Sequence, residues 1–401
     1  MDKFKCAAEL VRSLPLEKPV IGLRPHAARR AARWFLDNFP GEVLYALKAN
    51  SSPEIVQTLY DAGIRHFDVA SLPEVHQASA LPGAEVHVMH PVKSRRLIAE
   101  AYHDFGVRTF ALDSEEELEK ILAETNNAKD LTLMVRLACP SNYSQVSLEG
   151  KFGISWHKSP ELLRKARFAS DRFGVTFHVG SQAMSPLAYG QALRSVSQHI
   201  VQAAVTVDVV DCGGGFPSRY PDLTPPPLSD YVTTIAEAFE DMTVSYSAEL
   251  WCEPGRALVA EAESVIMRVE ARKGSTLYVN DGAFGTLFDA ALLKFVFPAR
   301  AIAKPGTDFG GDLVEFDLYG PTCDSFDYMP GPFMLPADVA EGDFVEVGNI
   351  GAYGRAIAGN FNGFGQYENA VLTDEPMLTM YVRDADAKVA APTAEVIALH
   401  N

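Results

Sequence analysis

The sequence predicts an α/β protein: a (β/α)8 barrel over residues 30–260, followed by a β-rich domain of Greek-key or sandwich type over residues 261–401. Three observations predict this division. The chain of 401 residues exceeds the usual size of one domain. Short apolar runs alternate with helical stretches up to about residue 260. Beyond that point the runs are short, often alternate, and are punctuated by Gly, Pro and Asp.

Eight apolar runs supply the predicted barrel strands. Their spacing of roughly 20 to 40 residues fits one strand plus one helix, and eight right-handed units of this kind close into a barrel. After the first run, EVLYAL, we expect a helix with Ser52 as N-cap, Pro53 as its first residue and Gly63 at its end. The other runs are IRHFDVAS, EVHVMHP, VRTFALDS, LTLMVRLACP, VTFHVGS, VTVDVVDCGGG and AELWCEPG.

Helical stretches separate these runs, notably SEEELEKILAE, SPELLRKARFASDRFG and LSDYVTTIAEAFEDM. In the second domain the predicted strands are SVIMRVEARKG, TLYVNDG, DLVEFDLYG, DFVEVGNIG and LTMYVRD. Residues 1–29 contain the run PVIGL, which is expected to add a strand to one of the two domains; periodicity does not decide which.

Composition excludes some classes of partner. The net charge of -17 argues against binding nucleic acid through a basic face. No apolar run reaches the roughly 18 residues of a membrane span, and the N-terminus lacks a signal-peptide core, so we expect a cytoplasmic protein. The five cysteines are scattered and have no metal-ligand spacing, so we expect free thiols and no metal site among them.

In a (β/α)8 barrel, side chains at the carboxyl ends of the strands meet at one rim. Taken singly, each such residue has an ordinary explanation; Asp113, for example, is most simply a helix-starting residue beside the N-cap Ser114. Taken together they predict a cofactor site. The strand ends carry Lys48, Asp68, His90, Asp113, Arg136, His178 with Ser181, Asp211 before Gly213, Gly214 and Gly215, and Glu253 before Gly255 and Arg256.

The glycine turns indicate a phosphate site, because glycine lets backbone N–H groups approach an anion closely. A phosphate site opposite a strand-end lysine suggests pyridoxal phosphate, which needs an amine for a Schiff base. Lys48 would supply the amine, Glu253 would face the ring nitrogen, and His178 would offer a flat surface for the ring. We expect burial and neighbouring cations to lower the pKa of Lys48 and make it nucleophilic.

Eight blocks, in order from about residue 40 to 368, resemble the ornithine decarboxylase family of the alanine-racemase-like pyridoxal enzymes. These blocks are YALKAN, FDVAS, FHVGSQ, DCGGGFP, EPGRALVA, LYVNDG, YGPTCDSFD and GAYGRAIAGNFNGF. The resemblance implies that Lys48 carries the cofactor, that His178 stacks on its ring, and that Glu253 binds its ring nitrogen. The phosphate would be held by Ser181, Gly214, Gly215, Gly255, Arg256 and Tyr353, with Asp68 and Arg136 supporting the site.

The resemblance also implies that Cys323 protonates the α-carbon after carbon dioxide leaves, and that Asp324 binds the distal ammonium of the substrate. In this family both come from the partner subunit, which implies an obligate homodimer with two shared sites. One departure concerns a further Tyr-Asp pair of the family that helps bind the distal amine. Ungapped alignment places Leu292 and Leu293 there, and Phe288 with Asp289 could replace the pair only if the loop is shortened.

The implied reaction is decarboxylation of a basic L-amino acid, first of all L-ornithine to putrescine. L-Lysine stays an alternative substrate, because its one additional methylene lets an enzyme discriminate it from L-ornithine by only about 1 to 3 kcal/mol. A carboxylated polyamine also stays open. Diaminopimelate is disfavoured, since that branch usually has Cys-Glu-Ser where this chain has Cys323, Asp324 and Ser325, and the arginine branch normally has a much longer chain. An amino-acid racemase would need a Tyr base in place of Cys323, and an inactive regulatory homologue would be expected to lack Lys48 or Cys323.

Overall fold

Eight parallel strands form a closed barrel, as the sequence predicts. The computed structural model describes residues 1–381. Around the barrel the strands follow the order β11-β12-β3-β4-β5-β6-β7-β9. Seven of the eight lie within the predicted runs, and β9 overlaps its run only at Val175 and Thr176. The strands are β3 (Glu42–Ala46), β4 (His66–Val69), β5 (Glu85–Val88), β6 (Thr109–Leu112), β7 (Thr132–Arg136), β9 (Arg172–Thr176), β11 (Val209–Asp211) and β12 (Glu249–Cys252).

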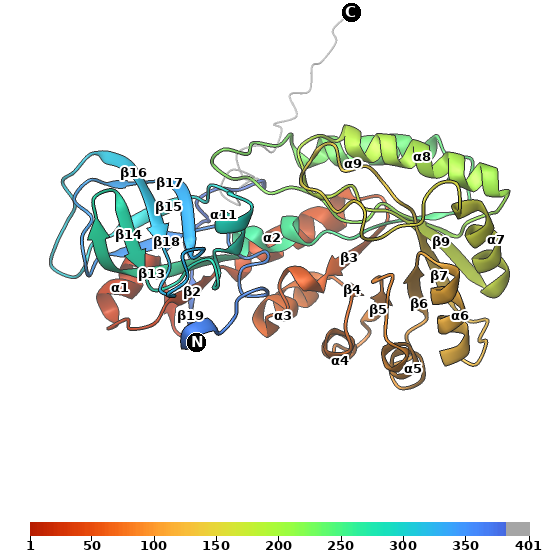
Figure 1. Ribbon diagram of the computed structural model, residues 1–401, viewed down its shortest axis with the longest axis horizontal. Helices are drawn as coiled ribbons and strands as arrows, with labels where there is room; N and C mark the ends of the chain where they lie inside the picture. The colour runs from red at the N-terminus through yellow and green to blue at the C-terminus, as the bar shows by residue number, and fades with distance from the viewer. Residues whose placement is uncertain (382–401) are drawn as a thin grey trace, which may run out of the picture.

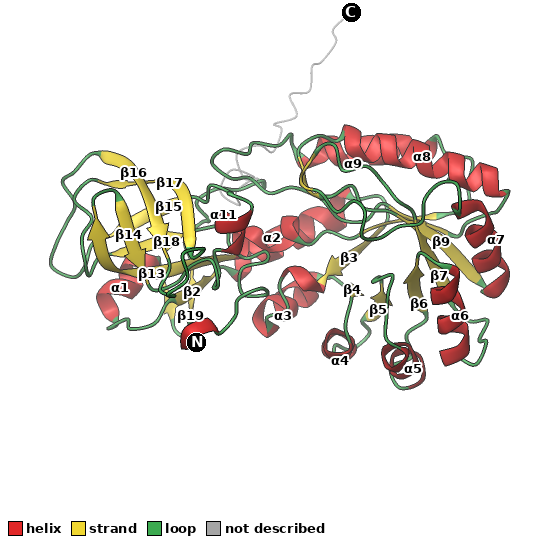
Figure 2. Ribbon diagram, in the orientation of Figure 1, coloured by secondary structure: helices red, strands yellow, loops and turns green. Residues whose placement is uncertain are grey.

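Amphipathic helices surround the barrel (Figure 2), because each buries one apolar face against the strands. They are α2 (Pro25–Asn38), α3 (Pro53–Ala62), α4 (Leu72–Ser79), α5 (Arg95–His103), α6 (Glu115–Glu124), α7 (Ser159–Ala169), α8 (Leu187–Ala203), α9 (Leu228–Glu240) and α10 (Arg256–Val259).

Helix ends follow the predicted residues with two differences. Helix α3 begins at Pro53 and ends at Gly63, whose φ of 119° is left-handed. The Ser52 hydroxyl, however, donates to Asn50 Oδ1 at 2.6 Å and makes no capping bond to the helix. The predicted helix over 159–174 was too long: α7 ends at Ala169, because the chain from Arg172 onward pairs with β7 as strand β9.

The second domain is a nine-stranded sheet that uses both ends of the described chain (Figure 1). Strand β2 (Val20–Leu23) pairs with β13 and β19, so the N-terminal run joins this domain and not the barrel. The other strands are β1 (Lys3–Phe4), β13 (Glu263–Lys273), β14 (Thr276–Val279), β15 (Ala299–Ile302), β16 (Leu313–Tyr319), β17 (Tyr328–Pro336), β18 (Phe344–Val347) and β19 (Glu368–Leu372).

Short elements complete the fold. Two helices lie in the second domain, α1 (Ala7–Ser13) and α11 (Phe288–Leu292), and three 3-10 turns are η1 (Leu47–Ala49), η2 (Ala260–Ala262) and η3 (Phe361–Gly363). Strands β8 (Ser144–Val146) and β10 (Ser181–Ala183) form a small sheet at the barrel rim. The strand predicted at 378–384 is absent over 378–381, and its remaining residues lie outside the described part. Among residues 1–381, no helix has the length and apolar character needed to span a membrane.

The two domains meet beside the Lys48 turn. Tyr353 donates its backbone N–H to the carbonyl of Ala49 at 2.8 Å, and the Asn50 amide donates to the carbonyl of Gly351 at 2.8 Å. These bonds bring the loop after β18 to the barrel rim. The rim and this loop therefore share the walls of one site.

Glu261, next to this junction, makes stability depend on pH. Burial raises the pKa of Glu261 to about 7, although Thr379 and Met380 donate hydrogen bonds to its carboxylate. Between about pH 4.5 and pH 7 the folded protein keeps a proton that the unfolded chain has lost, so stability falls as pH rises through this window, by on the order of 3 kcal/mol. We expect Glu261→Gln to remove this component, measured as melting temperature against pH; parallel profiles for the two proteins would contradict the assignment.

Candidate active site

Lys48 lies in the turn η1, directly after β3. Its Nζ is 2.7 Å from Oδ2 of Asp68, which stands near the end of the neighbouring strand β4. The lysine side chain is 44% exposed because it borders an open cavity, whereas Asp68 is buried. An ion pair between adjacent strand ends thus fixes the amine at the rim.

The expected lowering of the pKa of Lys48 was wrong. Burial does act to lower the pKa of this amine, but the carboxylates of Asp68 and Glu253 outweigh burial and raise it. The neighbouring charges are anionic, not cationic as the sequence suggested. Lys48 is therefore an ammonium in the protein alone, and it must give up a proton before it can act as a nucleophile.

A cavity of about 530 Å³ opens next to Lys48 between the barrel rim and the second domain. It brings together residues that are far apart in the sequence. Of the predicted site residues, those lining it are Lys48, Asp68, His90, Arg136, His178, Ser181, Arg256 and Tyr353. Residues 146–149 and 151–152, from the segment between β7 and α7, cover part of the cavity.

Glu253 follows β12 and lies among carboxyl groups. It is 4% exposed, and its Oε1 has no hydrogen-bond partner among the described residues. Burial, Asp211 and Asp68 raise the pKa of Glu253 well above its ordinary value. Asp211 itself is held by the Thr176 hydroxyl at 2.6 Å and the Gly213 N–H at 2.9 Å. Glu253 is therefore a buried acid with a free oxygen, and a cation or a proton donor beside it would satisfy that oxygen.

His178, after β9, presents a neutral ring. Burial, Arg136 and Lys48 lower the pKa of this imidazole well below its ordinary value. Its Nδ1 accepts the Gly180 N–H at 3.0 Å, which fixes the ring orientation. Gly214 packs against the same ring: a Cβ at this position would lie 3.0 Å from His178 Nε2. Only a glycine turn lets the backbone approach the imidazole and the Glu253 carbonyl this closely.

The turns predicted to bind phosphate lie around Arg256. Gly215 has a φ of 108°, a left-handed value that favours glycine. Gly255 precedes α10 and packs on Ala49 beside Lys48. The buried Arg256 guanidinium donates to the Tyr220 hydroxyl and to Asp289 Oδ2, each at 2.9 Å, while its Nε has no partner among residues 1–381.

Asp289 is a site residue that the sequence analysis did not assign to this role. It lies in α11, and its carboxylate pairs with Arg256, 33 residues earlier in the chain. Because its carboxylate is paired with Arg256, Asp289 does not replace the family's Tyr-Asp pair as a free carboxylate. Leu292 and Leu293 do line the cavity, as the alignment suggested, together with Phe288 and Ile357.

Cys323 and Asp324 lie apart from this cavity, in a turn between β16 and β17. The Cys323 thiol is exposed and donates to Asn362 Oδ1 at 3.1 Å. Asp324 Oδ1 accepts the N–H of Phe326 at 2.9 Å, and the Phe326 side chain is 81% exposed. Neither Cys323 nor Asp324 is among the residues that line the Lys48 cavity of the same chain.

Asp113 makes a long-range hydrogen bond that could not be predicted from the sequence. Ser114 caps α6, as predicted, by accepting the Glu117 N–H. The Asp113 carboxylate instead accepts the N–H of Gly153 at 2.8 Å, which holds the end of the segment that covers the cavity. The sequence showed Asp113 at a strand end before a capping Ser, but it did not show that Asp113 binds the N–H of Gly153, 40 residues later.

The residues present fit pyridoxal phosphate. Within residues 1–381, Glu253 Oε1 and Arg256 Nε are buried without a hydrogen-bond partner; the first is suited to a protonated ring nitrogen and the second to an anion. An amine, a flat neutral imidazole and two close glycine turns surround the same region. When bound, this cofactor supplies an electron sink for negative charge at a substrate carbon.

Comparisons with known proteins agree with this fit. Residues 26–260 match the family model described as pyridoxal-dependent decarboxylase, pyridoxal binding domain. An ornithine decarboxylase from Panagrellus redivivus is 32% identical over 371 residues, covering 86% of this chain and 82% of that protein. A lysine/ornithine decarboxylase from Selenomonas ruminantium is 31% identical, covering 83% and 84%. The structure of a lysine/ornithine decarboxylase from Vibrio vulnificus with cadaverine matches with a TM-score of 0.78 and 28% identity, over 92% of this chain and 100% of that chain.

The family model covers more than half of the chain, and the cited relatives cover most of it at about one-third identity. The enzyme class and the cofactor follow from this match together with the cavity around Lys48. The chain belongs to the family of pyridoxal-dependent decarboxylases.

Proposed function

We propose that this enzyme decarboxylates a basic L-amino acid, first of all L-ornithine, to give putrescine and carbon dioxide. The observation that carries the proposal is the cavity that joins Lys48, His178 and Arg256, beside the buried Glu253, whose Oε1 has no hydrogen-bond partner among residues 1–381. The relatives named ornithine and lysine/ornithine decarboxylases support a basic substrate. Lysine is the second candidate for the same reason.

In this proposal Lys48 holds the cofactor covalently through Nζ. Asp68 Oδ2, 2.7 Å away, is placed to accept the proton that the ammonium must lose. Glu253 would bind the ring nitrogen and keep it protonated, and Asp211 would hold Glu253 in place from behind. His178 would support the ring, with its neutral charge preserved by burial and by Arg136.

The phosphate would be held by Ser181, Arg256 and Tyr353, which line the cavity, with the Gly214–Gly215 turn beside His178 and Gly255 beside Ala49. Asp289 would orient the Arg256 guanidinium, leaving Nε toward the anion. Apolar side chains such as Leu292, Leu293 and Ile357 would exclude water from the cavity, which strengthens the electrostatic interactions inside it.

Cys323 and Asp324 would complete the site from a second copy of the chain. Cys323 is exposed and Asp324 is half-buried, and both lie away from the cavity of their own chain, as residues that serve a partner would. We therefore propose a homodimer in which Cys323 returns a proton to the substrate carbon and Asp324 binds the distal ammonium. The cytoplasmic location stays a prediction from the sequence.

Substrate choice is tested by specificity constants for L-ornithine, L-lysine, L-arginine, diaminopimelate and a carboxylated polyamine, measured side by side. We expect L-ornithine to be highest. A larger kcat/KM for L-lysine would favour the second candidate, and formation of a D-amino acid without carbon dioxide would contradict decarboxylation.

Asp324 gives a sharper prediction about the distal ammonium. Replacing Asp324 by Asn removes the charge but keeps the shape, so we expect KM for L-ornithine to rise by about tenfold or more, the loss of one charge-assisted hydrogen bond of roughly 1.5 to 3 kcal/mol. Asp308→Asn, an exposed change in the same domain, is the control. An unchanged KM in Asp324→Asn would remove Asp324 from the substrate site.

A further inference from the structure

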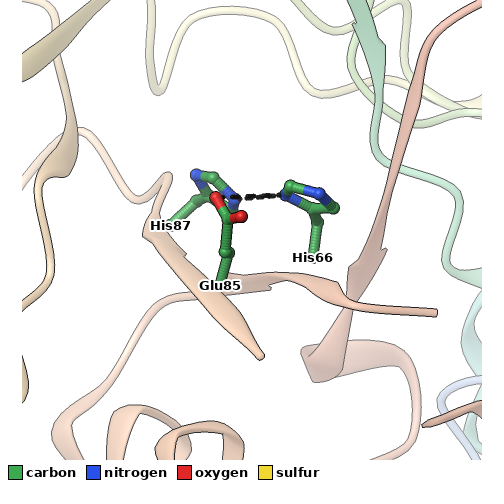
Figure 3. Close-up of side chains that lie close together, drawn as sticks. All are labelled: His66, Glu85 and His87. Carbon is green, nitrogen blue, oxygen red and sulfur yellow. Dashed lines mark hydrogen bonds and ion pairs between the residues drawn. The ribbon is translucent and has the colours of Figure 1, made fainter. Parts of the chain in front are cut away.

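A second cluster of chemically capable side chains lies at the opposite end of the barrel from Lys48. His66 begins β4, and Glu85 and His87 lie on the neighbouring strand β5, with His66 paired to Glu85 in the strand register. These positions are at or near the amino ends of the strands, whereas the cofactor cavity is at the carboxyl ends. Figure 3 shows the three side chains directed toward one another.

The donor atoms are close enough to share one ion. His66 Nδ1 lies 3.0 Å from His87 Nε2 and 3.8 Å from a Glu85 carboxylate oxygen, and all three donors lie within 4.8 Å of one another. Two imidazole nitrogens on a tetrahedral zinc ion, with bonds of about 2.0 to 2.1 Å, stand roughly 3.3 Å apart. The observed spacing therefore needs only a small opening of the pair to hold an ion.

The outer nitrogens of both rings have partners of their own. His66 Nε2 is 3.2 Å from a Glu42 carboxylate oxygen. His87 Nδ1 is 3.0 Å from the Thr109 hydroxyl. The inner nitrogens, 3.0 Å apart, form a hydrogen bond when one of them carries a proton. In the tautomers that place the ring protons on His66 Nε2 and His87 Nδ1, both inner nitrogens present lone pairs, and a cation can bind there. A carboxylate or hydroxyl behind each histidine is the usual outer support of a metal ligand.

The surroundings leave the cluster open to an ion from solvent. Glu85 is 68% exposed, so an ion can enter from solvent and water can fill its remaining positions.

We propose that His66, His87 and Glu85 form a binding site for one divalent transition-metal ion of the zinc class. Two imidazoles and one carboxylate are a ligand set that suits zinc, with water completing the coordination. The ion ties β4 to β5 at the amino-terminal end of the barrel, where residues serve stability and not chemistry. It is independent of the cofactor site and of the identity of the substrate.

The test uses the full chain with its cofactor bound, incubated with zinc chloride in phosphate-free buffer and passed through a desalting column. Metal content is then measured by mass spectrometry. We expect about one zinc ion per chain in the wild type, loss of that ion in His66→Ala and Glu85→Gln, and retention in His103→Ala, which changes an exposed histidine on α5. Retention in Cys323→Ala separates this site from the exposed thiol.

Zinc-free wild type, or equal zinc content in the wild type and in Glu85→Gln, would overturn the site. Glu85→Gln keeps the test valid even if His66→Ala fails to fold, because Glu85 is largely exposed. The melting temperature of the wild type should rise with zinc and return with a chelator, and that of Glu85→Gln should not respond. Zinc retention with no change in the wild-type melting temperature would contradict the proposed link between β4 and β5.

Discussion

The Lys48→Ala variant is expected to lose decarboxylase activity by at least about 10²- to 10⁴-fold, the range for removing a positioned proton-transfer group. The loss should lie at the upper end or beyond, because the same change would also remove the proposed covalent attachment of the cofactor. The measurement is kcat with L-ornithine, together with the visible absorption of the purified protein. The absorption that arises from the cofactor–lysine linkage should disappear.

The matched control is Lys158→Ala, an exposed lysine at the start of α7, outside the cavity. This variant should keep both activity and absorption. Lys48→Ala leaves the glycine turns, Glu253 and Arg256 unchanged, so we expect the cofactor to bind without the covalent linkage. Wild-type turnover in Lys48→Ala would show that another amine performs the reaction.

Cys323→Ala is expected to lower amine formation by about 10²-fold or more, the effect of removing a general acid, while cofactor binding stays unchanged. Its exposed thiol lies apart from the Lys48 cavity of the same chain, so in the proposed homodimer this loss would arise in the site of the partner subunit. Mixing Lys48→Ala with Cys323→Ala tests that reason. Half of randomly formed dimers would combine the two variants and carry one intact site, so about a quarter of wild-type activity should return.

Recovery of activity in this mixture requires that the dimers exchange subunits. Exchange is checked by mixing two wild-type preparations that carry different tags and detecting dimers that carry both. Absence of restored activity despite such exchange would contradict the shared site. A self-mix of either variant should restore nothing. Normal amine yield from Cys323→Ala alone would remove Cys323 from the proposed reaction.

The barrel could be predicted because each of its strands is marked by a pattern of neighbouring residues in the sequence. Each strand is a short apolar run bounded by a turn, as at Leu44 in β3 and Val135 in β7, and regular spacing converts eight such runs into a closed sheet. The rim residues followed from the same logic, since Lys48, Arg136 and His178 all stand at strand ends. These predictions needed no knowledge of which side chains touch.

Pairings across the fold could not be predicted. The bond between Arg256 and Asp289 depends on where the short helix α11 packs. The cluster of His66, Glu85 and His87 depends on the register between β4 and β5, because a shift by one residue would turn its side chains to the other face. The N-terminal run was visible as a strand, yet only tertiary pairing assigns it to β13 and β19.

The prediction for the pKa of Lys48 was wrong because it, too, depends on contacts across the fold. Sequence position located the amine correctly at the rim, but its pKa depends on the sign of its neighbours. Asp68 and Glu253 come from β4 and the end of β12, and their charges outweigh burial. A strand-end lysine can thus be identified from local pattern, whereas its protonation requires the assembled rim.

The most direct test of this account identifies the residue that carries the cofactor. The holoenzyme is reduced with borohydride, digested, and mapped by mass spectrometry for the peptide that retains the pyridoxyl group. We predict modification at Lys48, in the segment YALKAN. Stoichiometric modification of any other lysine, with Lys48 unmodified, would contradict the central claim that this barrel-rim amine is the catalytic attachment point.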